Sequence, residues 1–263
     1  MRAVENNYLT AIPYQTQRLA NRRQFLFSMN NFIRYILLPI FFLTSISIAT
    51  AERPNPVASR NVGGNVLYYF TLHEAFGASV GTSIYTPDEI TLLADITLNA
   101  PLIIGDNQHI ILIPNGSRTI IRGSDLIDYP VIWVSGENAS LTLGNPQTED
   151  LDIGFALIID GGYLQGIPII ANAPLAAVNG PDSKLIMNDN VFLQNNCNEG
   201  ASPTNSTYEI GAGVFIRTAG DIQDRLAEFI MRGGVIQGNF ANLQTYMACG
   251  GGVMLAGFSL FTM

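Results

Sequence analysis

The sequence predicts an all-β fold in which short parallel strands stack as the rungs of a solenoid. Two observations support this fold class. Short apolar runs rich in β-branched residues recur at about ten-residue intervals, with strong turn sequences between them. The second half of the chain also repeats itself. With 263 residues, of which 48% are apolar and 13% charged, the chain is long and apolar enough to form a packed core.

Residues 1–51 are interpreted as a signal peptide. An apolar run follows Arg34 and ends in Ala49–Ala51, where small residues suit a signal peptidase. We expect cleavage before Glu52. A membrane anchor is the alternative, but the run is short for a bilayer and contains Pro39.

Two further features of this segment leave alternatives open. Met29 would give a shorter signal peptide, in which case residues 1–28 are a start-site artefact. Arg22 and Arg23 resemble a twin-arginine export signal, although they lie well before the apolar run. Both alternatives predict an exported protein.

A polar linker is expected over residues 52–64, and a short helix over Phe70–Phe76 follows it. Leu72, Ala75 and Phe76 are spaced for one face of a helix, and Thr71 is a suitable N-cap. We expect this helix to cap the N-terminal end of the solenoid.

Strands are expected in most of the remaining chain, apart from a brief helical pattern around Ile222–Phe229. Such short strands also suit a sandwich or an antiparallel barrel, so the internal repeat decides in favour of a solenoid. The expected strands of the first half are Ile90–Leu93, Ile96–Leu98, Leu102–Ile104, Ile110–Ile113, Thr119–Ile121, Val131–Val134, Leu141–Leu143 and Leu157–Ile159.

The repeat consists of two aligned segment pairs. Leu185–Asn196 aligns with Phe229–Asn239 with one residue of slippage, and the glycine-led strands Gly211–Ile216 and Gly250–Leu255 follow them, 39 residues apart. A solenoid buries the apolar face of each rung against the next rung. Asn196 and Asn239 are then expected to stack as a ladder. A third copy begins at Phe261, so we expect residues 65–263 to be a parallel β-helix truncated inside its next repeat.

These repeats resemble those of the right-handed parallel β-helix (pectin-lyase-like) surface proteins of bacteria. The resemblance covers residues from about Leu72 to Met263 and depends on the motifs G-G-G-V-x-L and F-x-M-x-G-G-x-I-x-G-N. It implies a right-handed parallel β-helix and a secreted or cell-surface, adhesin-like protein. The same fold also houses polysaccharide lyases and hydrolases, so the resemblance implies fold and location better than activity.

The charge of the exported part limits its partners. Without residues 1–51, the chain keeps 8 basic and 20 acidic residues, a net charge of −12, and its one lysine is Lys184. Nucleic acid is excluded as an expected partner because phosphate binding needs a basic surface. No membrane insertion is expected after signal cleavage. Ca²⁺ remains an open possibility without a specific motif, and no other cofactor is expected.

No residue forms a recognisable catalytic motif, so we assign no catalytic, cofactor or metal site. The segment containing Asp150 and Asp152, with Asp160 nearby and Arg118 and Arg122 on earlier rungs, is the one place for an acidic-polysaccharide site. A solvated acidic loop is the favoured interpretation of it.

Histidines and cysteines add no clear site. His73 is interpreted as an exposed helix residue and His109 as a turn residue, and two histidines are too few for a catalytic metal site made of them. Cys197 and Cys249 lie one repeat apart, where they either form a disulfide between rungs or pack as two small buried residues.

The expected function is therefore structural and adhesive, without evident catalysis. Its partner would be a surface glycan or a host or cell-surface protein, bound by the long loops Asn198–Ile210 and Thr218–Glu228. The alternative is a polysaccharide lyase or glycoside hydrolase acting through the Asp150–Asp160 segment. A transported passenger that needs a further C-terminal domain is a third possibility.

Overall fold

The computed structural model describes residues 54–146, 154–164, 166, 168–199, 211–218, 225–241 and 251–263. Residues Asn55–Met263 form one compact unit. The signal peptide expected over residues 1–51 lies outside the described residues. So do Asp150, Asp152 and Cys249, and most of the two loops expected to bind a partner.

The described chain begins with an antiparallel hairpin. Strands β1 (Ala58–Val62) and β2 (Asn65–Tyr69) are joined by Gly63 and Gly64, whose φ angles of 57° and 85° suit a two-residue hairpin turn. β1 also pairs antiparallel with β3 (Asp88–Leu92). The stretch expected as a linker over residues 52–64 therefore contains a strand. Its polar sequence gives no strand pattern, but pairing on both edges makes it a strand.

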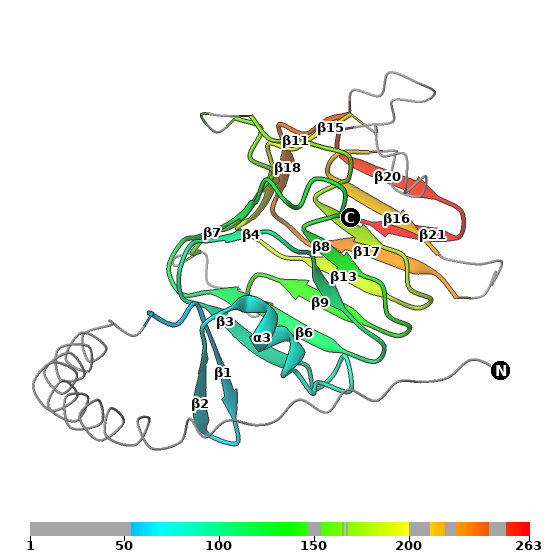
Figure 1. Ribbon diagram of the computed structural model, residues 1–263. Helices are drawn as coiled ribbons and strands as arrows, with labels where there is room; N and C mark the ends of the chain where they lie inside the picture. Colours follow the sequence, from blue (N-terminus) through cyan, green and yellow to red (C-terminus); the bar gives the residue numbers. More distant parts are fainter. Residues whose placement is uncertain are drawn as a thin grey trace, which may run out of the picture. The chain divides into compact units, whose positions relative to one another are not determined.

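Helix α3 (Leu72–Gly77) lies beside this hairpin (Figure 1). Thr71 and Glu74 form the capping box: the Glu74 amide donates to Thr71 Oγ1 at 3.1 Å, and the Thr71 amide donates to Glu74 Oε2 at 3.1 Å. The helix and its N-cap are confirmed, with Leu72, Ala75 and Phe76 buried. Within the described residues, no helix is long and apolar enough to cross a bilayer.

From β3 onward the chain runs repeatedly through a set of parallel sheets, and we call each circuit, which begins with a strand of the largest sheet, a pass. The chain completes five passes and begins a sixth. The strands after β3 have the following bounds: β4 (Ile96–Leu98), β5 (Leu102–Ile104), β6 (His109–Pro114), β7 (Arg118–Arg122), β8 (Ile132–Val134), β9 (Ser140–Leu143), β10 (Leu157–Asp160), β11 (Ile170–Ala171), β12 (Ala176–Val178), β13 (Lys184–Met187), β14 (Val191–Gln194), β15 (Cys197–Asn198), β16 (Val214–Arg217), β17 (Ala227–Met231), β18 (Val235–Gln237), β19 (Phe240–Ala241), β20 (Val253–Ala256) and β21 (Ser259–Thr262).

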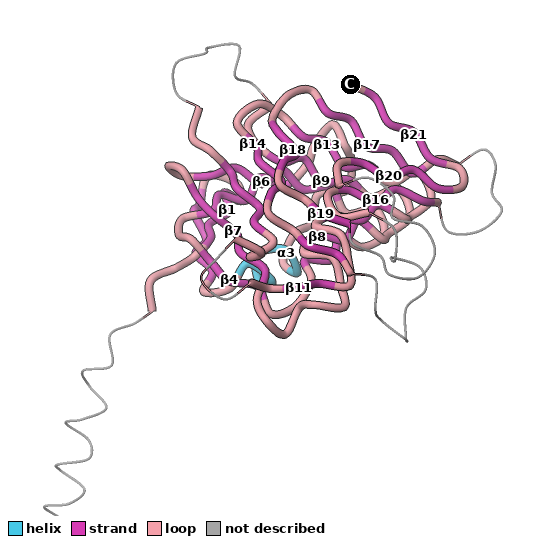
Figure 2. The backbone as a smooth tube through the Cα atoms, turned by 90° about the horizontal axis from the view of Figure 1, so that it is seen from above, coloured by secondary structure: helices cyan, strands magenta, loops and turns pink. Residues whose placement is uncertain are grey.

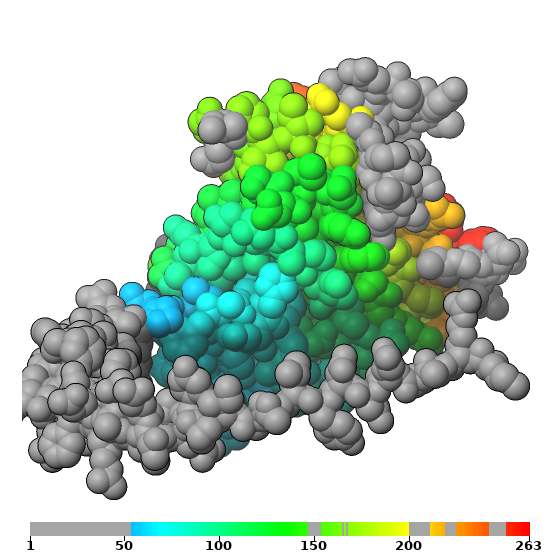
Figure 3. All heavy atoms as spheres, viewed as in Figure 1, coloured from blue at the N-terminus to red at the C-terminus, as the bar shows by residue number. Residues whose placement is uncertain are grey.

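Equivalent strands of successive passes lie side by side (Figures 1 and 2). Sheet 1 has the order β2-β1-β3-β6-β9-β13-β17-β21, sheet 2 β18-β14-β10-β7-β4, sheet 3 β11-β15-β19 and sheet 4 β20-β16-β12-β8-β5. Apart from the two antiparallel pairings of β1, with β2 and with β3, all pairings in these sheets are parallel. In Figure 3 the colours of the described residues follow one another in sequence order, as stacked passes require. The expected all-β class with parallel strands is confirmed.

The register of the last passes matches the sequence repeat. Met187 pairs with Met231, whereas Phe192 pairs with Val235, so the alignment slips by one residue between sheet 1 and sheet 2. Val214 pairs with Val253. The helical pattern expected around Ile222–Phe229 is wrong in its described part, because Ala227–Met231 forms strand β17 within sheet 1.

One apolar core fills the space between the sheets. Alternate residues of the sheet 1 strands, such as Ile110, Leu112, Leu141 and Leu185, are fully buried in it. The ring of Phe229, also fully buried, stacks on Phe261 of the next pass at 5.3 Å between ring centroids. The core therefore continues from one pass to the next, and its apolar contacts hold successive passes together.

Arg122 is an exception within this core, because its guanidinium is fully buried. It donates hydrogen bonds to four carbonyl oxygens in two segments, those of Leu126 and Tyr129 and those of Ala173 and Pro174. Burial lowers the pKa of Arg122 to about 9, which leaves the side chain protonated at neutral pH. This cation ties a loop of the second pass to the third.

The corners between sheets are held by stacked polar residues and by close backbone contact. The Asn196 backbone amide donates to Asn239 Oδ1 at 3.0 Å, so the two asparagines expected to form a ladder join these passes through one backbone group and one side chain. At another corner, a Cβ added to Gly136 would lie 2.0 Å from the carbonyl carbon of Gly105. At the Gly136 position, the backbones of two successive passes are therefore in direct contact.

Candidate functional site

A cleft of about 580 Å³ lies on the outer face of sheet 1. We call it the sheet cleft. Its floor comes from β6, β9 and β13, and Tyr85 and Pro87, from the segment before β3, stand at its rim. The Tyr85 side chain is 91% exposed. A concave site that combines apolar and polar groups is the usual form of a small-ligand site.

Two rows of side chains cross the strands of sheet 1, and their members on β6, β9 and β13 form the floor of the sheet cleft. His109, Ser140, Lys184 and Glu228 are paired in register from β6 to β17 and form the polar row. Two residues further along, Ile111, Thr142, Ile186 and Ile230 form the second, more apolar row. Their inward neighbours belong to the core, so strand alternation places both rows on the outer face.

A buried histidine and serine stand at one end of the polar row. His109 Nδ1 lies 2.8 Å from Ser140 Oγ, and the two residues are 3% and 2% exposed. His109 Nε2 is buried and has no hydrogen-bond partner among the described residues. Burial lowers the pKa of His109 below its ordinary value of 6.5, so the imidazole is neutral at neutral pH.

Charged side chains occupy the other end of the sheet cleft. Lys184 Nζ lies 2.8 Å from Glu228 Oε2, next to Ser140 in the polar row. At the rim, Asp182 accepts from Arg225 Nε at 2.6 Å. Arg232 is exposed at the end of β17, and its guanidinium has no ion-pair partner among the described residues. It is thus available to a ligand.

The histidine–serine pair of this cleft is not completed to a triad by any described residue. The distance between His109 and Ser140 suits a base and a nucleophile, but no described carboxylate contacts His109 Nε2 to stabilise a protonated ring. Ser140 is also too buried for direct attack on a bound group. The described residues contain no group of three or more acidic, histidine or cysteine side chains that could hold a metal ion.

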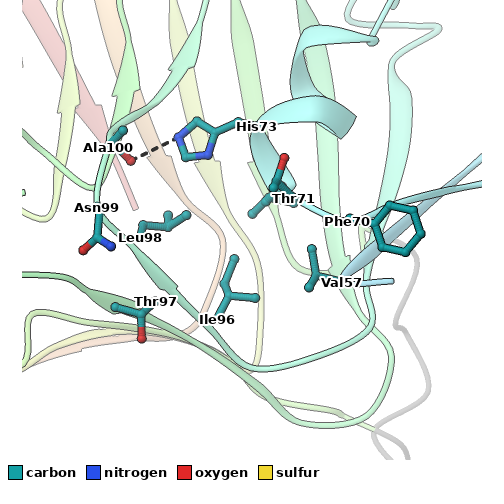
Figure 4. Close-up of a pocket in the computed structure, with 10 residues that line it drawn as sticks. Val57, Phe70, Thr71, His73, Ile96, Thr97, Leu98, Asn99 and Ala100 are labelled. Carbon is teal, nitrogen blue, oxygen red and sulfur yellow. Dashed lines mark hydrogen bonds between the residues drawn. The ribbon is translucent and has the colours of Figure 1, made fainter. Parts of the chain in front are cut away.

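A second cavity, of about 450 Å³, lies between helix α3 and β4 (Figure 4). Val57, Ile96 and Leu98 give it an apolar lining. His73 is exposed, as expected, and its Nε2 lies 3.2 Å from the carbonyl oxygens of Ala100 and Pro101. Because this histidine already joins α3 to the first pass, the cavity offers fewer unpaired polar groups than the sheet cleft.

The expected acidic site finds no support in its described part. Asp160 is 3% exposed, and its oxygens accept from the Gly162 amide, Gln194 Nε2 and Asn195 Nδ2 at 2.7 to 3.0 Å. Arg122 is committed to backbone carbonyls. Asp150 and Asp152 lie outside the described residues, so the lyase or hydrolase alternative remains a prediction without a described site.

Two other expectations can be compared with the structure. His109 is not a turn residue as expected but the first residue of β6, because its backbone amide donates to the Gly81 carbonyl and its ring packs on the neighbouring strand. Cys197 is buried and free, and burial raises the pKa of its thiol. Its expected partner Cys249 lies outside the described residues.

Sequence reasoning did not identify the sheet cleft. Its polar residues are separated along the chain by whole passes, so no local motif contains them. The available signal was their equivalent position, one residue before an inward leucine or isoleucine, in the successive strands β6, β9 and β13. Comparisons with protein-family models, with curated proteins and with solved structures found no match to this chain.

Proposed function

We propose that this chain is the exported, structural and adhesive part of a surface protein, folded as a right-handed parallel β-helix with α3 as its N-terminal cap. The support for the fold is the in-register stacking of equivalent strands over five passes. Connections between parallel strands of one sheet are almost always right-handed, which is the basis for the proposed hand. Burial of the apolar face of α3 beside β1 and β5 supports its role as a cap.

The proposed activity is the binding of a surface glycan in the sheet cleft. The observation that carries this proposal is the polar row beside an apolar row on a rigid sheet, with exposed Tyr85 at the rim. Sugar rings present hydroxyl groups along their edges and apolar C–H groups on their faces. Lys184 and Arg232 would hydrogen-bond the hydroxyls, and the tyrosine ring would stack on a sugar face.

A glycan array tests this proposal, with the full exported protein probed with and without Ca²⁺. We expect retention of a subset of glycans without chemical change. The array is also read for unsaturated or reducing ends, because turnover would favour the lyase or hydrolase instead. Absence of retention on any glycan would contradict glycan binding and leave a protein partner or a purely structural role.

Matched arginine variants locate the site. Arg232 and Arg217 are both exposed arginines, but Arg217 belongs to β16 on sheet 4. We expect Arg232→Ala to weaken glycan retention about tenfold, the scale of one charge-assisted hydrogen bond, and Arg217→Ala to leave it unchanged. Equal effects of the two substitutions would place binding elsewhere.

Export is tested separately by sequencing the N-terminus of the protein recovered outside the producing cell. We propose that it starts at Glu52, after removal of residues 1–51. Recovery of the protein only inside the cell, with its N-terminus intact, would contradict the proposed location.

A further inference from the structure

The free edge of β2 lies at one end of sheet 1 (Figure 1). Within the described residues, β2 pairs only with β1. Its middle residues Val66, Leu67 and Tyr68 are 51%, 44% and 61% exposed, although successive residues of a strand point to opposite faces. Val62 and Phe70 add further exposed apolar surface next to them, at 38% and 49%. A patch of this kind on a folded protein marks an interaction surface.

The hairpin turn determines which backbone groups of β2 are free. In a hairpin with a two-residue turn, the residues that flank the turn, here Val62 and Asn65, form a hydrogen-bonded pair. Hydrogen-bonded pairs alternate along the strands, so Leu67 and Tyr69 also bond to β1. The amide and carbonyl groups of Val66 and Tyr68 therefore point away from β1, and no hydrogen-bond partner of either residue is found among the described residues.

Nothing in the sequence of this edge blocks further pairing. Proteins usually protect a free strand edge with a charge or a proline, but residues 61–72 contain neither. This contrasts with an exported part whose net charge is −12. Two acidic copies of the chain would approach with least repulsion through such an uncharged surface.

We propose that β2 is a dimerisation edge, which pairs antiparallel with β2 of a second copy of this chain. A two-fold axis through Leu67 places Val66 opposite Tyr68 of the partner subunit. These are the residues with free backbone groups, so the pairing satisfies all four groups of each strand at once. The same axis brings Leu67 against Leu67 of the partner subunit, which buries an exposed apolar side chain. Sheet 1 then continues from one copy into the other.

A second copy fits this edge better than an unrelated strand because the edge is complementary to itself. Hydrogen-bonding positions, side-chain faces and the absence of charge all match under one symmetry operation. The edge is short, so the expected dimer is weak and depends on concentration.

Sedimentation of the purified protein over about 1 µM to about 500 µM tests the proposal. We expect the mass to rise from that of a monomer to that of a dimer. Val66→Pro removes an amide that points to the free edge and leaves the bonds to β1 in place. We expect this variant to dimerise at least about tenfold more weakly, through loss of two hydrogen bonds per dimer, with an unchanged melting temperature. A wild-type protein that stays monomeric throughout, or a folded Val66→Pro variant that dimerises as well as wild type, would overturn the proposal.

A cross-link gives an independent readout. Leu67 and Leu67 of the partner subunit form a pair that is not hydrogen-bonded, with Cα atoms about 4.5 Å apart, within reach of a disulfide. We expect Leu67→Cys to form a disulfide-linked dimer under mild oxidation. The control is Tyr85→Cys, at a site that is 91% exposed and lies outside β2, in the segment before β3. Equal cross-linking of both variants, or none by Leu67→Cys, would contradict pairing through β2.

Discussion

Two glycines in equivalent turns, Gly105 and Gly136, provide a sharp test of how closely the passes stack. A Cβ at position 136 would lie 2.0 Å from the Gly105 carbonyl carbon and 2.2 Å from the Asp106 amide nitrogen, where ordinary contacts are 3.4 to 4 Å. Both neighbours are backbone atoms, so no side chain can rotate away. Gly136→Ala therefore requires the two passes to separate by more than about 1 Å. A Cβ at Gly105, in contrast, meets no atom within 4 Å.

The contacts at this corner determine how much stability Gly136→Ala should remove. The Gly136 amide donates to the Ile104 carbonyl at 3.0 Å, and the Asn107 amide donates to the Glu137 carbonyl at 2.8 Å. Separation of the passes weakens both hydrogen bonds, at about 1 kcal/mol each, and overpacking adds about 1–3 kcal/mol. We expect Gly136→Ala to lower the free energy of unfolding by about 3–5 kcal/mol.

The assay is thermal and urea unfolding of the two alanine variants beside the wild type. For a domain of this size the expected loss corresponds to a melting temperature roughly 10 °C lower. Gly105→Ala should be neutral or stabilising by up to about 1 kcal/mol, because alanine restricts the unfolded chain and meets no clash. If Gly136→Ala unfolded at the wild-type temperature, or if the two variants lost equal stability, the close backbone contact between these passes would be refuted.

Three further predictions concern single side chains. Phe229→Ala should lower the free energy of unfolding, measured in urea, by about 3–5 kcal/mol, because the ring is fully buried and stacked. Phe192→Ala should lower it clearly less, because Phe192 is half-buried. Asn196→Ala should cost about 1–3 kcal/mol, since its side chain donates to two buried carbonyl oxygens; a neutral substitution would show that these two hydrogen bonds are dispensable. Burial lowers the pKa of His109, so the unfolded chain takes up its proton below about pH 6.5 while the folded chain does not, and stability falls as the pH drops through that range. His109→Gln should reduce this pH dependence, measured as the unfolding free energy at about pH 7.5 and about pH 5; an unchanged slope would contradict the assignment.

The sequence predicted the repeating architecture well because the signals for it are local. Strands Ile96–Leu98 and Leu102–Ile104 have the expected bounds, since turn residues flank each β-branched run. The aligned repeats also indicated the pairing of Met187 with Met231. Short strands without that composition were missed: Ala176–Val178 is alanine-rich, and its neighbours on both sides within sheet 4 make it a strand.

The sheet cleft was beyond sequence reasoning for a different reason. His109 and Ser140 are adjacent through strand register, and a register between passes of unequal length cannot be read from either strand alone. The burial of Arg122 was equally hidden, because an arginine in a strand usually points to solvent, and here carbonyl oxygens from two passes surround it. Both examples depend on contacts between distant parts of the chain.

The stacking of equivalent strands makes the length of this protein an adjustable quantity. Ser140 and Lys184 occupy equivalent positions in sheet 1, one pass apart. The Ser140 backbone amide donates to the carbonyl oxygen of Gln108, the residue before β6, and the Lys184 backbone amide donates to that of Ala139, the residue before β9. Excision of residues 140–183 would therefore bring Lys184 into the place that Ser140 leaves, with strand β13 seated on β6. Such a shortened chain loses one layer of core and keeps its remaining contacts between neighbours. Addition or loss of one complete pass would then disturb the fold less than an insertion of a few residues within a pass.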